Sequence, residues 1–180
     1  MEKLTMQELN RMTVEEFKAA DKIPIVIVLD NIRSQNNIGS IFRTADSFRL
    51  QSIFLCGITA TPPHREIHKT ALGATETVHW QYFPDTIDAL YQLKSQGFII
   101  AAVEQTRKSI FLPDFSPSSE GKLAFVFGNE VNGVDEKVFN LCETILEIPQ
   151  FGTKHSLNVS VAVGIVIWDI ISRRNFSGRL

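Results

Sequence analysis

Three short segments of the sequence bring polar side chains and glycines close together, and such segments can bind a ligand or act on one. They span residues 29–45, 125–134 and 148–162. Amides, hydroxyls and carboxylates orient a substrate through hydrogen bonds, and an arginine holds a phosphate or stabilises a developing negative charge. Each segment alone also fits an ordinary polar turn or an exposed helix face, so the surrounding elements must decide. The side chains in these segments that could do chemistry are Asn37, Arg43, Glu130, Ser156 and Asn158.

The first segment follows a run of five apolar residues at 25–29, which is typical of a strand buried on both faces. Residues 30–39 therefore lie at the carboxyl edge of the predicted sheet, where open α/β sheets hold ligands. Asn37 is suited to cap the helix that follows, and Gly39 would let another backbone approach closely. Arg43 lies on the helix face opposite the apolar residues, so we expect its side chain to point away from the core.

The other two segments join a strand to a turn and a turn to a helix. In the second, an apolar strand runs into Gly128 and Gly133, which permit turn conformations that other residues avoid and leave backbone groups free to bind a ligand. In the third, we expect Ser156 to cap the last helix and Asn158 to lie in its first turn. That helix is apolar nearly all round from 159 to 171, which predicts burial in the core and in a subunit interface.

Three more familiar kinds of site are excluded by the residues at their critical positions. After Gly128, Val134 and Asp135 stand where a phosphate loop needs Lys and Ser or Thr, so nucleotide hydrolysis is excluded. The chain contains no G-x-G-x-x-G motif, which leaves an ordinary dinucleotide-binding turn unsupported. His64 is followed by Arg65 instead of the glutamate of a zinc-protease motif, and we predict no metal site.

The elements that must position these segments follow from the hydrophobic periodicity. Strands alternate with helices, and several strands are apolar at every position. This pattern predicts an α/β fold with a mostly parallel sheet and helices on both faces. Strands are predicted at residues 25–29, 52–56, 77–80, 98–103, 122–127 and 144–148, and helices at 5–20, 38–48, 86–96, 135–142 and 157–174, with a loop at 107–121. A capping box of Thr13 and Glu16 predicts a break in the first helix near Thr13, and a weak helix is expected before the strand at 77–80.

Composition favours a globular protein of one domain. The 180 residues are 44% hydrophobic and 21% charged, with no apolar run long enough to cross a membrane and no secretory signal. We expect Cys56 and Cys142 to be buried free thiols, and we expect a cytoplasmic protein. A net charge of −2 limits any RNA contact to local basic surface. Basic side chains gather at Arg33, Arg43 and Arg49, at Arg65 and Lys69, and in a tail with Arg173, Arg174 and Arg179.

Taken together, in order and spacing, the three segments resemble the SpoU (TrmH-like) RNA ribose methyltransferases of the SPOUT superfamily. The resemblance covers residues 25–172. It is carried by Asn37, Gly39, Arg43, Thr44 and Ala45 in the first segment, by Phe127, Gly128, Glu130 and Gly133 in the second, and by Ile148, Pro149, Ser156, Leu157, Asn158, Val159 and Ser160 in the third.

The resemblance implies a fold, a cofactor and an assembly. Members of this family have a C-terminal deep trefoil knot that holds S-adenosyl-L-methionine, and they work as homodimers with the last helix in the interface. It further implies a helical extension at 1–22 and a SPOUT methyltransferase domain at 23–180. The cofactor-binding residues that it implies are Gly128, Ile148, Gln150, Leu157 and Ser160.

The resemblance also assigns chemical roles. Arg43 assists removal of the proton from a ribose 2′-hydroxyl, and Asn37 orients the ribose side. Because arginine is normally always protonated, Arg43 is either a base helped by the RNA phosphate or a cationic clamp for the developing alkoxide. Glu130, Ser156 and Asn158 organise Arg43 and the knot loop.

Four substrate and function classes stay open at this stage. The short segment before the first strand favours tRNA as the substrate, since compact members of the family often act on tRNA. The alternatives are a ribosomal RNA 2′-O-methyltransferase, a knotted base methyltransferase, and a non-catalytic RNA-binding dimer. No membrane partner is expected.

Overall fold

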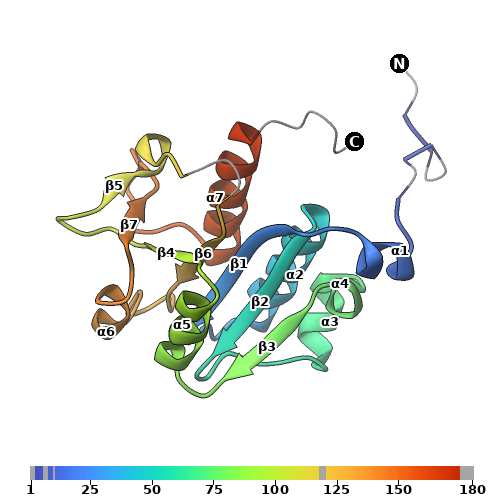
Figure 1. Ribbon diagram of the computed structural model, residues 1–180, viewed down its shortest axis with the longest axis horizontal. Helices are drawn as coiled ribbons and strands as arrows, with labels where there is room; N and C mark the ends of the chain where they lie inside the picture. Colours follow the sequence, from blue (N-terminus) through green and yellow to red (C-terminus); the bar gives the residue numbers. More distant parts are fainter. Residues whose placement is uncertain (1–2, 6–7, 10, 118–120, 175–180) are drawn as a thin grey trace.

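A parallel β-sheet forms the centre of the molecule (Figure 1). The structure is a computed structural model that describes residues 3–5, 8–9, 11–117 and 121–174. Within these residues seven strands pair in the order β3-β2-β1-β6-β4-β7-β5, and every pair is parallel. The predicted α/β fold with a parallel sheet is therefore confirmed. The strands are β1 Ile23–Asp30, β2 Leu50–Cys56, β3 Trp80–Phe83, β4 Ile99–Val103, β5 Ile110–Phe111, β6 Leu123–Phe127 and β7 Thr144–Glu147.

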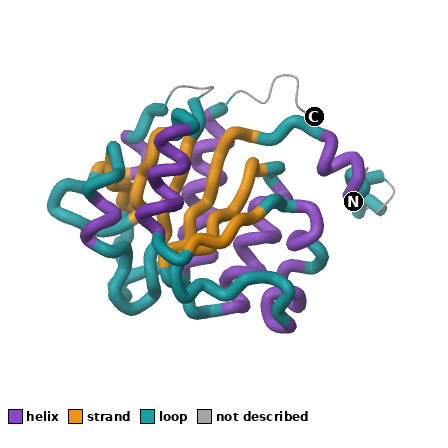
Figure 2. The backbone as a smooth tube through the Cα atoms, turned by 60° about the horizontal axis from the view of Figure 1, so that its bottom comes forward, coloured by secondary structure: helices purple, strands orange, loops and turns teal. Residues whose placement is uncertain are grey.

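Helices cover both faces of this sheet, as predicted (Figure 2). Side chains of β1 alternate between the faces, with Ile27 in one core and Val28 in the other. Residues of α1, α2, α3, α4 and α7 complete the first core, and residues of α5 and α6 complete the second. Burying each such side chain contributes about 1.5–3 kcal/mol relative to exposure. The helices are α1 Val14–Ala19, α2 Gln35–Ser47, α3 Arg65–Ala71, α4 Ala74–Thr77, α5 Thr86–Ser95, α6 Glu136–Phe139 and α7 Val159–Arg173, with a 3₁₀ turn at Leu112–Asp114.

Both helix starts that matter for the site differ from the prediction. Ser34, and not Asn37, caps α2, because its side chain accepts a hydrogen bond from the backbone N–H of Asn37. Asn158, and not Ser156, caps α7 by accepting from the backbone N–H of Ser160 at 2.9 Å. Asn37 therefore lies inside the first turn of α2 with its amide available for other contacts.

Three other elements also depart from the sequence prediction. Residues 74–77 form α4, so the strand predicted at 77–80 begins later, at Trp80. The predicted helix at 5–20 is reduced to α1, which starts at the capping box of Thr13 and Glu16; Met6 lies outside the described residues. Leu9 and Met12, two apolar residues of the predicted helix, are exposed and do not join the core. The predicted loop at 107–121 contains β5, which pairs with β7.

Within the single chain the last helix, α7, is buried on one side only, so its predicted burial in the core is confirmed for that side and the predicted subunit interface stays a prediction. Six of its residues, including Val163 and Ile167, lie in the core. Val161, Ile165 and Trp168 lie one or two turns apart on the other side, with 49%, 37% and 55% of their surface exposed. The helix therefore presents an apolar stripe that the single chain leaves uncovered.

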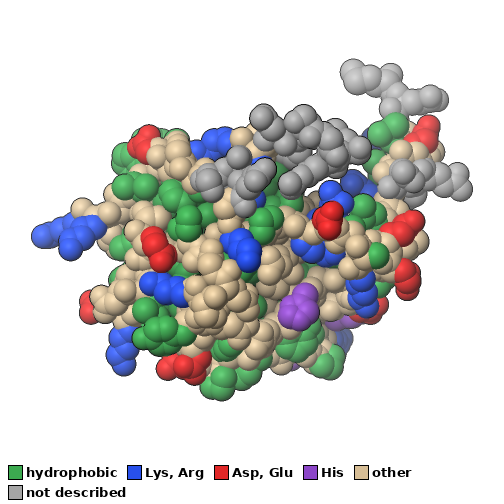
Figure 3. Space-filling view, viewed as in Figure 1, with side chains coloured by type: hydrophobic (Ala, Val, Ile, Leu, Met, Phe, Trp, Pro, Cys, Tyr) green, Lys and Arg blue, Asp and Glu red, His purple; other side chains and the backbone are tan. Residues whose placement is uncertain are grey.

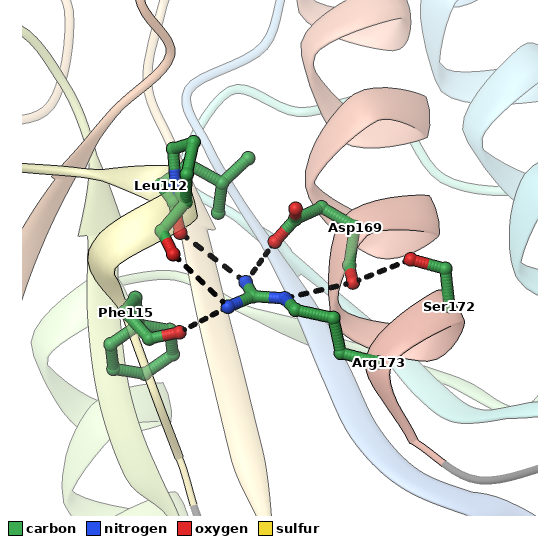
Figure 4. Close-up of polar contacts among 6 residues, drawn as sticks. Leu112, Phe115, Asp169, Ser172 and Arg173 are labelled. Carbon is green, nitrogen blue, oxygen red and sulfur yellow. Dashed lines mark hydrogen bonds and ion pairs between the residues drawn. The ribbon is translucent and has the colours of Figure 1, made fainter.

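The end of α7 is fastened to the turn after β5 by Arg173 (Figure 4). Its guanidinium donates to the carbonyl oxygens of Phe115 at 2.6 Å and Leu112 at 3.3 Å, and it pairs with Asp169 one turn earlier. Arg174 donates to the carbonyl oxygen of Gly121. Two arginines of the predicted basic tail thus serve internal contacts, and Arg179 lies outside the described residues.

Both cysteines are free, as expected. Cys56 is buried, as predicted, whereas Cys142 is only partly buried, which corrects the prediction for that residue. Burial raises the pKa of Cys56 to about 12 and that of Cys142 to about 12, because each thiolate would lose its hydration. Among the described residues, no helix is long and apolar enough to cross a membrane.

Candidate functional site

The side-chain amide of Asn37 joins the three polar segments. Its Nδ2 donates to Glu130 Oε1 at 3.2 Å, and its Oδ1 accepts from Asn158 Nδ2 at 3.1 Å. The Oδ1 atom of Asn158 in turn accepts from the N–H and the hydroxyl of Ser160. Residues that are 93 and 121 positions apart in sequence therefore form one polar chain, which starts in the second segment and ends in the third. The structure thus brings together three of the five predicted catalytic side chains.

Two glycines shape the turn that carries Glu130. A Cβ atom at Gly128 would collide with the backbone of Gly133 and Val134, so two stretches of main chain touch at this point. Gly133 has φ +69°, a left-handed conformation that favours glycine. The turn is closed by a pair of backbone hydrogen bonds between Asn129 and Gly133.

Asn129 anchors this turn, and the sequence prediction did not assign it a role. Its side chain is buried, donates to the carbonyl oxygen of Asn31 at 2.8 Å and accepts from the N–H of Val131 at 2.8 Å. The turn is thereby tied to the end of β1 as well as to β6. The sequence signal that could have identified Asn129 is its position as the first polar residue after an apolar strand and a glycine.

A cavity of about 630 Å³ opens beside the turn, at the carboxyl ends of β4, β6 and β7. Four of the five predicted cofactor residues line it, namely Gly128, Ile148, Gln150 and Leu157. Glu130 and Ser156 line it too. The fifth cofactor residue, Ser160, does not line it, because its hydroxyl donates to Asn158 Oδ1.

The end of β4 supplies a part of the cavity wall that the sequence prediction missed. Residues 103–106 line the cavity, and so do Val159 and Ala162 from the first turns of α7. The sequence holds one signal for this contribution: the apolar run of β4 stops abruptly at Glu104, and the next two residues are also polar. Such a change marks the carboxyl edge of a strand, where ligands bind.

Arg43 has a different position from the other predicted catalytic residues. It is exposed on α2, while Ile41 and Phe42 beside it are buried, as the helix pattern predicted. Within the described part of the chain its guanidinium forms no hydrogen bond or ion pair, and it does not line the cavity. The single chain therefore leaves this cation free to meet a partner from outside. Among the described residues there is also no cluster of side chains that could hold a metal.

Comparison with known proteins identifies the family. The chain matches the sequence model of the SpoU rRNA Methylase family over residues 24–168. The 23S rRNA (guanosine-2'-O-)-methyltransferase RlmB of Neisseria meningitidis serogroup B is 31% identical over 144 residues, which are 80% of this chain and 56% of that protein.

Solved structures of this kind share the fold. The TrmH/SpoU tRNA modifying enzyme of A. aeolicus superimposes with a TM-score of 0.80 at 22% identity, over 92% of this chain and 82% of that one. An AdoMet-bound rRNA methyltransferase of Sinorhizobium meliloti gives a TM-score of 0.76 at 25% identity, over 82% of this chain and 56% of that one. The chain spans 56–67% of the length of its curated relatives. Because the family match extends over most of its residues, this protein belongs to the SpoU rRNA methylase family.

Proposed function

We propose that this chain is an S-adenosylmethionine-dependent RNA methyltransferase that transfers a methyl group to a ribose 2′-hydroxyl, with tRNA as the substrate. The observation that carries the proposal is the bridge formed by Asn37 between Glu130 and Asn158, next to a cavity of about 630 Å³. Similar proteins include a guanosine-2'-O-methyltransferase and an AdoMet-bound rRNA methyltransferase, which supports the same reaction class.

The cavity suits the proposed cofactor in size and in the chemistry of its wall. Ligand pockets are commonly about 300–1,000 Å³ in volume. Ile148 and Leu157 offer apolar surface for an adenine ring, and the close approach of backbone at Gly128 leaves main-chain groups at the wall. The lining includes Glu104 and Glu130 but neither Lys nor Arg, which favours a ligand that carries positive charge. When bound, S-adenosylmethionine supplies a methyl group on a cationic sulfur.

The residues of the chain must hold the ribose hydroxyl and assist loss of its proton. Asn37 has both ends of its amide engaged, so its orientation is fixed from two elements at once. We infer that Asn37, Glu130 and Asn158 define the floor of the ribose site, with Ser156 at the cavity wall. Arg43 contributes a positive charge to the RNA phosphate or to the developing alkoxide, because a protonated guanidinium is a poor base but a strong electrostatic partner.

We propose further that residues 23–180 form the SPOUT methyltransferase domain with a C-terminal trefoil knot, and that two copies associate through α7. The apolar stripe of Val161, Ile165 and Trp168 supports the dimer, because contiguous exposed apolar surface marks interaction sites. The extension at 1–22 is attached through Phe17, which is buried in the core. The free thiols of Cys56 and Cys142 agree with a cytoplasmic location.

The similar proteins include both a tRNA modifying enzyme and a ribosomal RNA methyltransferase, so the proposal of tRNA over ribosomal RNA is left to experiment. On the face seen in Figure 3, Lys and Arg side chains are scattered among acidic and apolar ones. We infer that RNA binding on this face depends on a few local cations. Arg43 is an exposed cation on α2, the helix that carries Asn37.

The test is methyl transfer from labelled S-adenosylmethionine to purified tRNA and, in parallel, to ribosomal RNA, followed by nuclease digestion and nucleoside analysis. We expect the label in a 2′-O-methylated nucleoside of tRNA. Label in ribosomal RNA alone would identify ribosomal RNA, and not tRNA, as the substrate. Label on a base would show that the enzyme methylates a base and not a ribose. Cofactor and RNA binding without any transfer would favour the non-catalytic RNA-binding dimer.

A further inference from the structure

Glu104 occupies the middle of the strand ends that line the cavity. It is the first residue after β4, which lies between β6 and β7 in the sheet. The segments after those two strands supply Gly128 and Ile148 to the wall, and Glu104 lines the same cavity from between them. Glu104 lies outside the three polar segments, so no role was predicted for it from the sequence.

The carboxylate of Glu104 is held in place by backbone groups and still has acceptor capacity. Its Oε2 accepts from the N–H of Val134 at 3.2 Å, and its Oε1 accepts from the N–H of Gln105 at 2.9 Å. The side chain is half-buried, and no Lys, Arg or His of the described chain forms an ion pair with it. A carboxylate has about four lone-pair positions, so each oxygen keeps one acceptor site for a ligand.

A vicinal diol matches this arrangement. The 2′- and 3′-hydroxyls of a ribose are two adjacent donors. The distance between them is close to the distance between the two oxygens of one carboxylate. Acidic side chains at strand ends hold nucleotide ribose in this way in dinucleotide-binding folds, where the site also includes a glycine-shaped turn. Here the turn is that of Gly128 and Gly133, and Glu104 contacts it directly.

We propose that Glu104 is a cofactor-binding residue that accepts hydrogen bonds from the ribose hydroxyls of the adenosyl group. The proposal rests on the proposed function, because it requires an adenosyl cofactor in this cavity. It specifies which part of that cofactor the end of β4 recognises.

A purely structural role is the competing explanation. A Cβ atom at Gly133 would collide with the carboxylate of Glu104, so the side chain also braces the turn. A brace and a ligand contact both predict weaker cofactor binding after substitution. They differ in one respect: only a ligand contact makes the effect of the substitution depend on the ribose hydroxyls.

The experiment is therefore a cycle of variant and ligand, read by isothermal titration calorimetry. The ligands are S-adenosylhomocysteine and its 2′-deoxy and 3′-deoxy analogues, and the proteins are wild type and Glu104→Gln. For wild type, we expect loss of either hydroxyl to weaken binding by about 10-fold or more, the scale of a hydrogen bond to a charged group. For Glu104→Gln, which keeps one oxygen for the N–H of Val134, we expect weaker binding of the parent ligand and at most about threefold further loss with the deoxy analogues.

A matched control is Glu136→Gln, which removes a negative charge from another glutamate that lines the cavity. We expect this variant to retain the full dependence on the ribose hydroxyls. An unchanged deoxy penalty in Glu104→Gln would overturn the assignment and leave Glu104 as a brace. Equal binding of all three ligands by wild type would overturn it without any variant. Failure of wild type to bind S-adenosylhomocysteine or S-adenosylmethionine at all would instead refute the proposed function, and this assignment with it.

Discussion

Substitution Asn37→Asp tests the polar bridge at the centre of the site. The side chain keeps its shape and can still accept from Asn158, but it loses the donor that holds Glu130 Oε1 at 3.2 Å and gains a negative charge there. At this separation two unit charges repel by about 1 kcal/mol in a water-like dielectric and by about 5 kcal/mol at an effective dielectric of 20. Glu130 is exposed, so we use the lower figure.

The expected loss of stability at neutral pH combines three terms. Repulsion contributes about 1 kcal/mol, and loss of the hydrogen bond about 0.5–1.5 kcal/mol. A negative charge in the first turn of a helix stabilises the folded protein by about 0.3–1 kcal/mol through the helix dipole. The net cost is about 1–2 kcal/mol, which lowers Tm by about 2–8 °C in a chain of this length.

The cost should depend on pH with a definite sign. Two carboxylates in contact raise the pKa of the pair above the ordinary range of about 4, so the folded variant holds a proton more tightly than the unfolded chain does. The variant is therefore relatively most stable at acidic pH and loses that advantage as pH rises through the raised pKa. We expect the Tm gap between wild type and Asn37→Asp to be small at pH 4 and to widen by pH 7, as measured by thermal denaturation.

Asn36→Asp is the matched control, since Asn36 also lies in the first turn of α2 but its side chain forms no hydrogen bond within the described residues. It experiences the same helix dipole without a carboxylate in contact. Adding Glu130→Gln to Asn37→Asp should remove the pH dependence. If Asn37→Asp tracks Asn36→Asp at every pH, the bridge between α2 and the glycine turn does not exist in solution.

Further predictions concern catalysis, assembly and thiol chemistry. Arg43→Ala should lower methyl transfer by about 100-fold or more while cofactor binding by calorimetry stays unchanged, since the side chain is outside the cavity; near-normal turnover would exclude both roles considered for this arginine. Trp168→Glu should convert a dimer into a 20.3 kDa monomer, as measured by light scattering. Far-UV circular dichroism should be unchanged, because the side chain is 55% exposed in the single chain. A variant that remains dimeric would contradict an interface through α7. With pKa values of about 12, Cys56 and Cys142 should be alkylated at pH 8.5 far more slowly in the folded protein than in urea, as measured by mass spectrometry. Equal rates would contradict the burial of Cys56 and the partial burial of Cys142.

The sequence predicted the fold because burial on two faces leaves a clear pattern. β1 and β4 are apolar at almost every position, and only a strand inside a parallel sheet makes use of such a run. β5 has no such pattern, since its two residues are exposed, and within the described residues it pairs with β7 alone, a contact between segments far apart in sequence. β3 was placed too early because Thr77 and Val78 have high strand propensity, whereas the chain uses them to end α4.

The cap positions show where residue type alone is insufficient. Ser34 and Asn37 are both good cap residues, as are Ser156 and Asn158, and each pair lies within three residues. Residue type alone cannot decide which of the two caps the helix. The choice depends on the position and direction in which the chain leaves the preceding strand or turn. The error concerns function, since the capping residue of α7 is also the partner of Asn37, and Asn37 is free to bridge only because Ser34 caps α2.

Arg43 marks the limit of what one chain contains. The sequence resemblance puts it in the same site as Asn37, but in the structure its guanidinium is exposed and outside the wall of the cavity. A charge that acts on the ribose or its phosphate must nevertheless approach the reacting groups, because a water-exposed guanidinium stabilises an alkoxide weakly at a distance. Something outside this chain has to complete the site around Arg43. RNA is one such component, and a second copy docked on the apolar stripe of α7 is another, since α7 packs against the C-terminal end of α2 through Phe48 and Trp168. Catalysis in this protein is thus expected to depend on assembly, even though the cavity proposed for the cofactor is lined by residues of the single chain.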